Sequence, residues 1–209
     1  MTESQGYATA SDLRFLEFVP SDPTSCGGCV VYLHGAGERG TDLLSVKRYG
    51  LPAVVASGQV SLNFHLICPQ LEAEREWQPD RIAELLTYVR RQFGLVGLMG
   101  YSLGGQGVCE VLCRHGRVSE FAIAIAGRAQ SQVSVSQRGV SFLGIAGEHD
   151  SWSSMSSFVE GVNAAGGRAF EVTLPGHGHY TSEVALEQPA LQAMLATAGF
   201  ALQFAENVG

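Results

Sequence analysis

One serine of this sequence stands in a setting typical of nucleophilic chemistry. Ser102 lies at the centre of the pentapeptide Gly-Tyr-Ser-Leu-Gly (100–104), which fits the pattern G-x-S-x-G. In that pattern a sharp turn between a strand and a helix holds the serine in a strained conformation, and its hydroxyl attacks an acyl carbonyl. The chain has 26 glycines, so the pattern depends on its context. An apolar run precedes it and a helical pattern follows, which predicts that Ser102 is a nucleophile.

A serine nucleophile needs an acid and a base, which follow it in the order serine, acid, histidine in one large class of hydrolases. Asp150 is the only aspartate after Ser102, and it follows an apolar run at 140–146. Glu148 is the fallback, although its side chain would leave the turn in another direction. A second interpretation is that Asp150 is the N-cap of the next helix, because Ser-Trp-Ser-Ser follows it.

Two histidines compete for the role of base. His177 and His179 lie in Pro-Gly-His-Gly-His-Tyr (175–180), directly after the last expected strand. Residues two apart in a tight loop cannot both face Ser102. We favour His179, because it is nearer the next helix and the preceding Gly-His-Gly gives the loop freedom to turn. His177 remains the alternative base.

An earlier glycine-rich segment, Leu-His-Gly-Ala-Gly-Glu-Arg-Gly (33–40), follows another apolar run. We expect two backbone N–H groups to bind the oxyanion, one from Leu103 and one from this segment, from Ala36 or Gly37. His34 is expected to order the loop rather than to react. The competing interpretation is a glycine-rich turn with no part in catalysis.

The elements that must position these residues alternate between short apolar runs and helical patterns. This alternation predicts the α/β class, with a mostly parallel sheet and helices on both faces. We expect a single domain over 1–209. Strands are predicted at 13–19 (an edge strand), 29–33, 64–68, 95–99, 121–126, 140–146 and 169–174. Helices are predicted loosely at 42–57, from Pro79 to Phe93, at 103–114, at 153–165 and from Pro189 to Phe204, with a polar loop at 128–139.

Composition narrows the classes of function. The net charge is −7 and Lys47 is the only lysine, which argues against nucleic-acid binding, because that binding depends on clustered cations. No apolar stretch is long enough to span a membrane and the N-terminus lacks a secretory signal, so we expect a cytoplasmic protein. We read the five cysteines as reduced thiols, although Cys26-Gly-Gly-Cys29 has the spacing of half a metal or redox site. No metal or cofactor is expected.

With these residues placed, the chain resembles the α/β-hydrolase superfamily from about Cys29 to Tyr180. Within it, the similarity is to the phospholipase/carboxylesterase (acyl-protein thioesterase-like) group and to the related dienelactone-hydrolase and prolyl-oligopeptidase-like small esterases. The motifs that carry it are Leu-His-Gly-Ala-Gly-Glu-Arg-Gly, Cys-Pro-Gln (68–70) with Trp77, Gly-Tyr-Ser-Leu-Gly-Gly, Gly-Glu-His-Asp (147–150) and Gly-His-Gly-His (176–179).

The resemblance implies the α/β-hydrolase fold with a minimal lid or none, since no insertion is long enough for a large one. It also implies that Gly37 and Trp77 contact the substrate. An interpretation of Trp77 as a buried core residue has equal weight. Dienelactone hydrolases use a cysteine nucleophile, so the serine at position 102 argues against that activity.

The expected function is hydrolysis of a small-molecule carboxylic ester or thioester through an acyl-enzyme on Ser102. Two alternatives remain open at this point. One is a small serine peptidase of the prolyl-oligopeptidase-like type, and the other is a non-enzymatic member of the fold that binds a small ligand. The sequence favours no particular oligomeric state.

Overall fold

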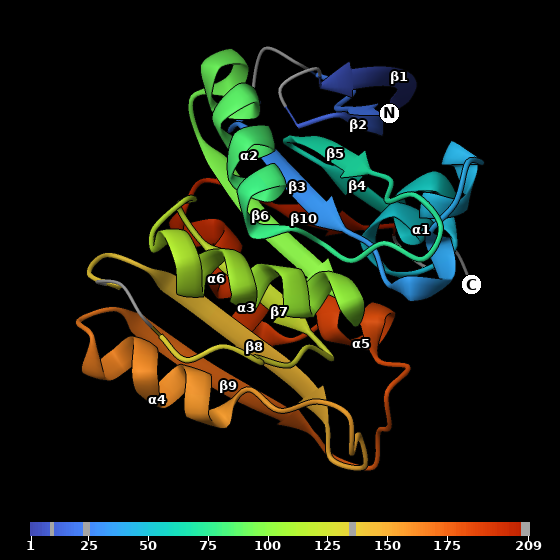
Figure 1. Ribbon diagram of the computed structural model, residues 1–209. Helices are drawn as coiled ribbons and strands as arrows, with labels where there is room; N and C mark the ends of the chain where they lie inside the picture. The colour runs from blue at the N-terminus through green and yellow to red at the C-terminus, as the bar shows by residue number, and fades with distance from the viewer. Residues whose placement is uncertain (9–10, 23–25, 134–136, 206–209) are drawn as a thin grey trace.

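The computed structural model describes residues 1–8, 11–22, 26–133 and 137–205 (Figure 1). Its centre is an eight-stranded sheet with the strand order β1-β2-β5-β3-β6-β7-β8-β9. The strands are β1 (Thr2–Ala8), β2 (Leu13–Val19), β3 (Cys29–Leu33), β5 (His65–Pro69), β6 (Val96–Tyr101), β7 (Ala122–Ile125), β8 (Ser141–Gly147) and β9 (Arg168–Leu174). β1 and β2 pair antiparallel, as do β2 and β5, and the remaining neighbours are parallel. The predicted, mostly parallel sheet is confirmed.

Helices cover both faces of the sheet, as the alternating sequence pattern predicts (Figure 1). One face packs against α2 (Pro79–Phe93), α3 (Leu103–His115) and α4 (Ser156–Ala164). The other packs against α1 (Gly50–Ala56), α5 (Ser182–Leu186) and α6 (Pro189–Thr197). Neighbouring side chains of β3 divide between the two apolar cores, Val31 and Leu33 facing one and Val30 and Tyr32 the other. This alternation is the two-residue period of a strand buried on both faces.

The N-terminal end of the sheet differs from the sequence-based expectation. The strand Leu13–Val19 was expected at the edge, but β1 pairs along its whole outer side and is itself the edge strand. The sequence of β1 is polar and most of its side chains are exposed. An exposed edge strand buries little side-chain surface, so its sequence lacks the apolar alternation that reveals β2.

The C-terminal segment also departs from the prediction of one helix reaching Phe204. α6 ends at Thr197, and β10 (Leu202–Phe204) then pairs with β4 (Val60–Leu62). Gly199 turns the chain with φ of 85°, in the left-handed region that favours glycine. Phe200 follows it into the core, where its ring contacts those of Phe64 and Phe121.

Other boundaries shift by a few residues. The segment predicted as loosely helical at 42–57 divides into a 3₁₀ helix, η3 (Leu43–Lys47), and α1. The helix predicted from Ser153 begins at Ser156. Of the loop expected at 128–139, residues 134–136 lie outside the described part, and the rest forms no helix or strand beyond one bridge from Arg128 to Ser154.

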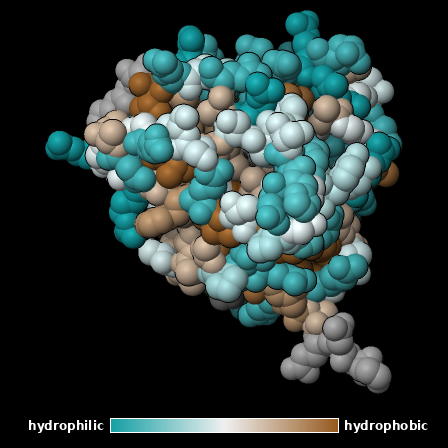
Figure 2. Space-filling view, turned by 90° about the horizontal axis from the view of Figure 1, so that it is seen from below, coloured by the Kyte–Doolittle hydropathy of each residue, from teal (hydrophilic) through white to brown (hydrophobic). Residues whose placement is uncertain are grey.

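The face of the molecule seen in Figure 2 carries its apolar residues as separate patches among polar ones. Within the described part of the chain, no helix is long and apolar enough to cross a membrane.

Candidate active site

The turn that holds Ser102 joins β6 directly to α3. Ser102 has φ of 55° and ψ of −116°, a conformation that non-glycine residues rarely adopt and that functional sites maintain through their surroundings. Its N–H donates to Ile125 O at 2.9 Å, which ties the turn to β7. A Cβ atom on Gly100 would lie 2.3 Å from Gly104 O, and one on Gly104 would lie 1.9 Å from Leu33 O. The flanking glycines are therefore required by close backbone packing.

The structure brings Ser102 together with one histidine and one aspartate from distant segments. Ser102 Oγ lies 2.8 Å from His179 Nε2, and His179 Nδ1 lies 2.7 Å from Asp150 Oδ2. Asp150 follows β8, and His179 lies in the loop between β9 and α5, so all three residues meet at the carboxyl edge of the sheet. A carboxylate at Nδ1 fixes the tautomer with the proton on Nδ1, which leaves Nε2 as an acceptor for the serine proton.

Asp150 is held from several directions. Its side chain is only 2% exposed, its Oδ1 accepts the N–H groups of Trp152 and Ser153, and its Oδ2 accepts the Ser153 hydroxyl at 2.6 Å. Burial acts to raise the pKa of Asp150, but the hydrogen bonds from Ser153 and His179 outweigh it and lower the pKa. The expected alternative role as a helix cap does not apply to α4, whose N-cap position is Met155.

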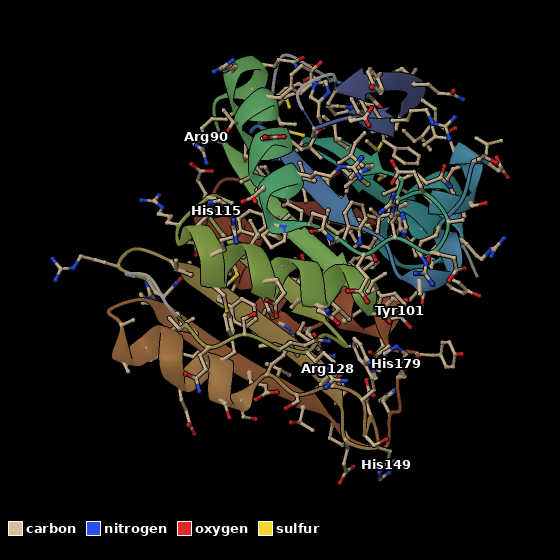
Figure 3. All side chains as sticks on the ribbon, viewed as in Figure 1. Arg90, Tyr101, His115, Arg128, His149 and His179 are labelled. Carbon is tan, nitrogen blue, oxygen red and sulfur yellow. The ribbon has the colours of Figure 1, made fainter. Side chains whose placement is uncertain are left out.

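The other histidines and the fallback acid lie elsewhere. The backbone oxygen of His177 accepts from His149 N, and within the described residues its side chain makes no hydrogen bond to Ser102. Glu148 instead accepts the N–H of Gly176 at 2.8 Å. His115 lies at the far end of α3, where it contacts Asp80, and Figure 3 shows it well separated from His179.

Two backbone donors expected at the oxyanion site lie beside Ser102. Leu103 opens α3, so its N–H has no acceptor within the helix. Ala36 opens the 3₁₀ helix η2 (Ala36–Glu38), and its N–H is likewise without an acceptor in that helix. A Cβ on the preceding Gly35 would lie 3.4 Å from Ser102 Cβ, so the loop and the serine are in direct proximity. Gly37 continues the same turn, and its carbonyl accepts a hydrogen bond from Arg48.

His34 and Trp77 support this loop from behind. Trp77 is 5% exposed, and its indole N–H donates to His34 O at 3.0 Å. The His34 ring accepts the Leu71 N–H at Nε2, so Nδ1 carries the proton that is shared with Gly35 O at 2.6 Å. Burial lowers the pKa of His34 to about 4, which keeps the ring neutral. Trp77 thus contacts the loop through its buried indole.

Glu38 is a buried acid to which the sequence analysis assigned no role. It is 1% exposed, lies at the end of η2, and its Oε1 has no hydrogen-bond partner among the described residues. Burial raises its pKa to about 7. The carboxyl oxygen Oε2 is close to Gly35, 3.3 Å from where a Cβ on that glycine would stand. The protonation of Glu38 therefore bears on the loop that faces Ser102.

Aromatic side chains surround His179. The imidazole contacts Trp152 at 5.3 Å between ring centres, Tyr101 at 5.8 Å and Tyr180 at 6.0 Å. The Tyr101 hydroxyl also donates to His179 O at 3.2 Å, and Tyr180 is 83% exposed. Neither these contacts nor the hydrogen bond from Ser153 was predicted from the sequence. The sequence signal for them is proximity along the chain: Trp152 and Ser153 follow the acid within three residues, and Tyr101 and Tyr180 are adjacent to Ser102 and His179.

No group of histidine, cysteine, aspartate and glutamate side chains in the described ranges is arranged to hold a metal ion. The five cysteines are free thiols, and four of them are buried.

No protein-family model matches the sequence, and no curated protein sequence matches it. The structure is similar to an esterase/lipase from an uncultured bacterium, with a TM-score of 0.67 and 13% identity over 95% of this chain and 82% of the other. It is also similar to a phospholipase/carboxylesterase from Dyadobacter fermentans, with a TM-score of 0.63 and 16% identity over 93% and 98%.

Larger proteins contain the same fold. A thermostable esterase matches with a TM-score of 0.66 and 18% identity, over 91% of this chain but 60% of the other. Dipeptidyl peptidase 4 from Porphyromonas gingivalis matches with a TM-score of 0.66 and 16% identity, over 93% of this chain and 35% of the other. These identities are too low to carry an activity across, but each match covers more than nine-tenths of this chain with a TM-score above 0.6. The chain therefore has the fold of the α/β-hydrolases.

Proposed function

We propose that the protein is a serine hydrolase that cleaves carboxylic esters or thioesters through an acyl-enzyme on Ser102. The observation that carries the proposal is the chain of two short contacts from Ser102 Oγ to His179 Nε2 and from His179 Nδ1 to Asp150 Oδ2, 2.8 Å and 2.7 Å long. A nucleophile, a base and an orienting acid in this order are the parts that acyl transfer requires.

Each residue has a definite part in the reaction. His179 Nε2 takes the proton of Ser102 Oγ as the oxygen attacks the acyl carbonyl, and Asp150 stabilises the imidazolium that forms. The N–H groups of Leu103 and Ala36 bind the negatively charged carbonyl oxygen, each contributing roughly 3 to 4 kcal/mol to the transition state. His179 then protonates the departing alcohol or thiol. Water, deprotonated by the same imidazole, releases the acid and restores Ser102.

Esterases supply most of the structural neighbours named above, which supports ester cleavage over peptide cleavage. The match to a dipeptidyl peptidase keeps peptide cleavage as an outcome that the test must separate.

The decisive experiment combines a covalent probe with a substrate panel. A fluorophosphonate should label the wild-type protein at Ser102, which peptide mass spectrometry would locate, and Ser102→Ala should remain unlabelled. Wild-type protein should hydrolyse p-nitrophenyl and thiophenyl acyl esters faster than the matching p-nitroanilides. Ser102→Ala should lower turnover by on the order of 10⁴ to 10⁶.

The proposal fails if folded wild-type protein is neither labelled nor active on any of these esters, which would favour a ligand-binding member of the fold. Faster cleavage of the anilides would favour the peptidase. Ser131→Ala is a suitable control, because its hydroxyl lies outside the site and contacts Glu110.

A further inference from the structure

An arginine that follows β7 stands beside the candidate active site in a fixed position. The backbone on both sides of Arg128 is bonded to Ser154, which donates to Gly127 O and accepts from Ala129 N, each at 3.1 Å. Gly127 also packs tightly on the first turn of α3, since a Cβ on Gly105 would lie 2.9 Å from Gly127 Cα. Arg128 therefore projects from a rigid point close to the turn that holds Ser102.

The side chain of Arg128 contacts the same indole that contacts His179, that of Trp152. Its guanidinium carbon is 5.5 Å from the ring centre of Trp152, which in turn is 5.3 Å from the imidazole centre of His179. Trp152 thus contacts both groups, and Figure 3 labels Arg128 and His179 in the same region of the view. Stacking on an indole holds a guanidinium in place and leaves its planar N–H edge available.

No group of the described chain uses that edge. Arg128 Nε is buried without a hydrogen-bond partner, and no carboxylate of the described residues lies within 4.0 Å of the guanidinium. By contrast, Arg39 and Arg48, near the oxyanion loop, donate to backbone carbonyls. Arg128 is half-buried, so the terminal nitrogens of its guanidinium, which make no hydrogen bond with the described residues, are the donors that a bound anion would contact.

We propose that Arg128, held by Trp152, binds a negatively charged oxygen group of the substrate, a carboxylate or a phosphate. This inference rests on the proposed ester hydrolysis and narrows its substrate class to esters with a second, anionic group. A guanidinium fork matches the two oxygens of such a group, and the N-terminal end of α3 adds positive potential nearby. The chain as a whole carries −7, so this local positive charge acts against a field that otherwise repels anions.

The test compares esters matched in length that differ in one charge. On the acyl side, p-nitrophenyl monoesters of succinate, glutarate and adipate are compared with the butyrate, pentanoate and hexanoate esters. On the alcohol side, 4-carboxyphenyl acetate is compared with 4-carbamoylphenyl acetate. A phosphonate analogue of the best carboxylate distinguishes carboxylate from phosphate recognition. Rates are corrected for uncatalysed hydrolysis.

We expect wild-type protein to favour the anionic member of at least one pair in kcat/KM, and less so at high salt, which screens the charge. Arg128→Gln should lower the ratio of anionic to neutral kcat/KM by about tenfold to a hundredfold, as expected for a hydrogen bond to a charged group. Arg128→Lys should retain part of the preference. Arg117→Gln, an exposed arginine beyond the opposite end of α3, should keep the wild-type ratio.

Two results would overturn the inference while leaving ester hydrolysis intact. One is a wild-type protein that shows no anionic preference in any pair. The other is an Arg128→Gln variant that changes both members of every pair in parallel, which would make Arg128 a support for Trp152. If Arg128→Gln does not fold, the inference is tested instead by Arg128→Lys and by the salt dependence of the wild-type ratio of anionic to neutral kcat/KM. Failure of the proposed function is distinct, because then neither ester would be cleaved and Ser102 would not be labelled.

Discussion

Ser153 and His179 donate to the same carboxylate oxygen. The Ser153 hydroxyl lies 2.6 Å and His179 Nδ1 lies 2.7 Å from Asp150 Oδ2. The aspartate is thereby fixed by a neighbour in its own turn before it orients the base. Among the described residues, the side-chain hydrogen bond of Ser153 is to Asp150, so we expect its effect on the reaction to pass through that carboxylate.

Replacing Ser153 by alanine tests this relationship. Without the hydroxyl, Asp150 loses one of the hydrogen bonds that lower its pKa, and the imidazole is held less firmly. We expect kcat for an activated ester to fall by about tenfold, the lower end of the effect of a hydrogen bond to a charged group, with little change in KM. Ser157→Ala, an exposed serine of α4, is the control. Unchanged kcat in Ser153→Ala would show that the remaining contacts of Asp150 suffice.

The two loop histidines give a second prediction. His179→Asn removes the proton acceptor of Ser102 and should lower kcat by on the order of 10⁴ to 10⁶, with the fold retained by circular dichroism. His177→Asn should stay within about threefold of wild type, because the described structure gives that side chain no contact with Ser102. The reverse pattern in steady-state ester hydrolysis would transfer the role of base to His177.

A third prediction concerns the close approach between α3 and β3. A Cβ on Gly104 would lie 1.9 Å from Leu33 O and 2.8 Å from His34 O, and backbone atoms cannot move aside at little cost. Gly104→Ala should therefore lower the free energy of unfolding by about 3 kcal/mol or more. Gly178→Ala, where no atom lies within 4 Å of the new methyl group, should change it by less than about 1 kcal/mol. Urea unfolding of both variants checks the contrast, and equal losses would contradict it.

The fourth prediction uses the buried carboxyl of Glu38. Burial raises its pKa in the folded protein to about 7 from the ordinary value of 4.5. Between those values the folded state binds a proton that the unfolded state has released. Its contribution to the free energy of unfolding therefore declines as the pH rises from about 4.5 to 7, and levels off above. Glu38→Gln should remove this decline and raise stability at pH 8 by about 1 to 3 kcal/mol.

Denaturant unfolding between pH 5 and 8, with the exposed Glu160→Gln as control, measures this difference. His34 acts in the opposite sense, because burial lowers its pKa to about 4 from 6.5. The contribution of the neutral His34 ring to the free energy of unfolding is lost as the pH falls from about 6.5 to about 4. The difference between Glu38→Gln and wild type isolates the carboxyl. A difference that does not vary with pH would contradict the assignment.

The sequence was most informative where chemistry and backbone geometry fall within a few residues. Gly100, Ser102 and Gly104 encode the turn locally. Chain order then selected Asp150 and left two histidines, of which the favoured His179 contacts both Asp150 and Ser102. Ser153 and Arg128 could not be identified in this way. Their partners are set by how the loops after β7 and β8 meet, and neither residue type is unusual in a polar loop.

The boundaries that were wrong have a common physical cause. β1 is stabilised by backbone pairing with the adjacent strand β2, and β10 by pairing with the distant strand β4, rather than by buried apolar faces. Single-sequence periodicity detects side-chain burial, so it detects such strands poorly. The helix predicted to reach Phe204 ends at Thr197, because Gly199 adopts a left-handed conformation that turns the chain.

The N-terminal strand has a consequence for self-association. β2 is an apolar strand, and its outer backbone edge is paired along its length by the polar residues of β1. A protein lacking residues 1–11 would present an unpaired row of N–H and C=O groups flanked by Leu13 and Phe15, a surface that templates pairing with another chain. With β1 in place, the side chains at the edge are mostly exposed polar groups instead. We therefore expect β1 to lower the tendency to aggregate at an edge of the sheet that is several strands away from Ser102.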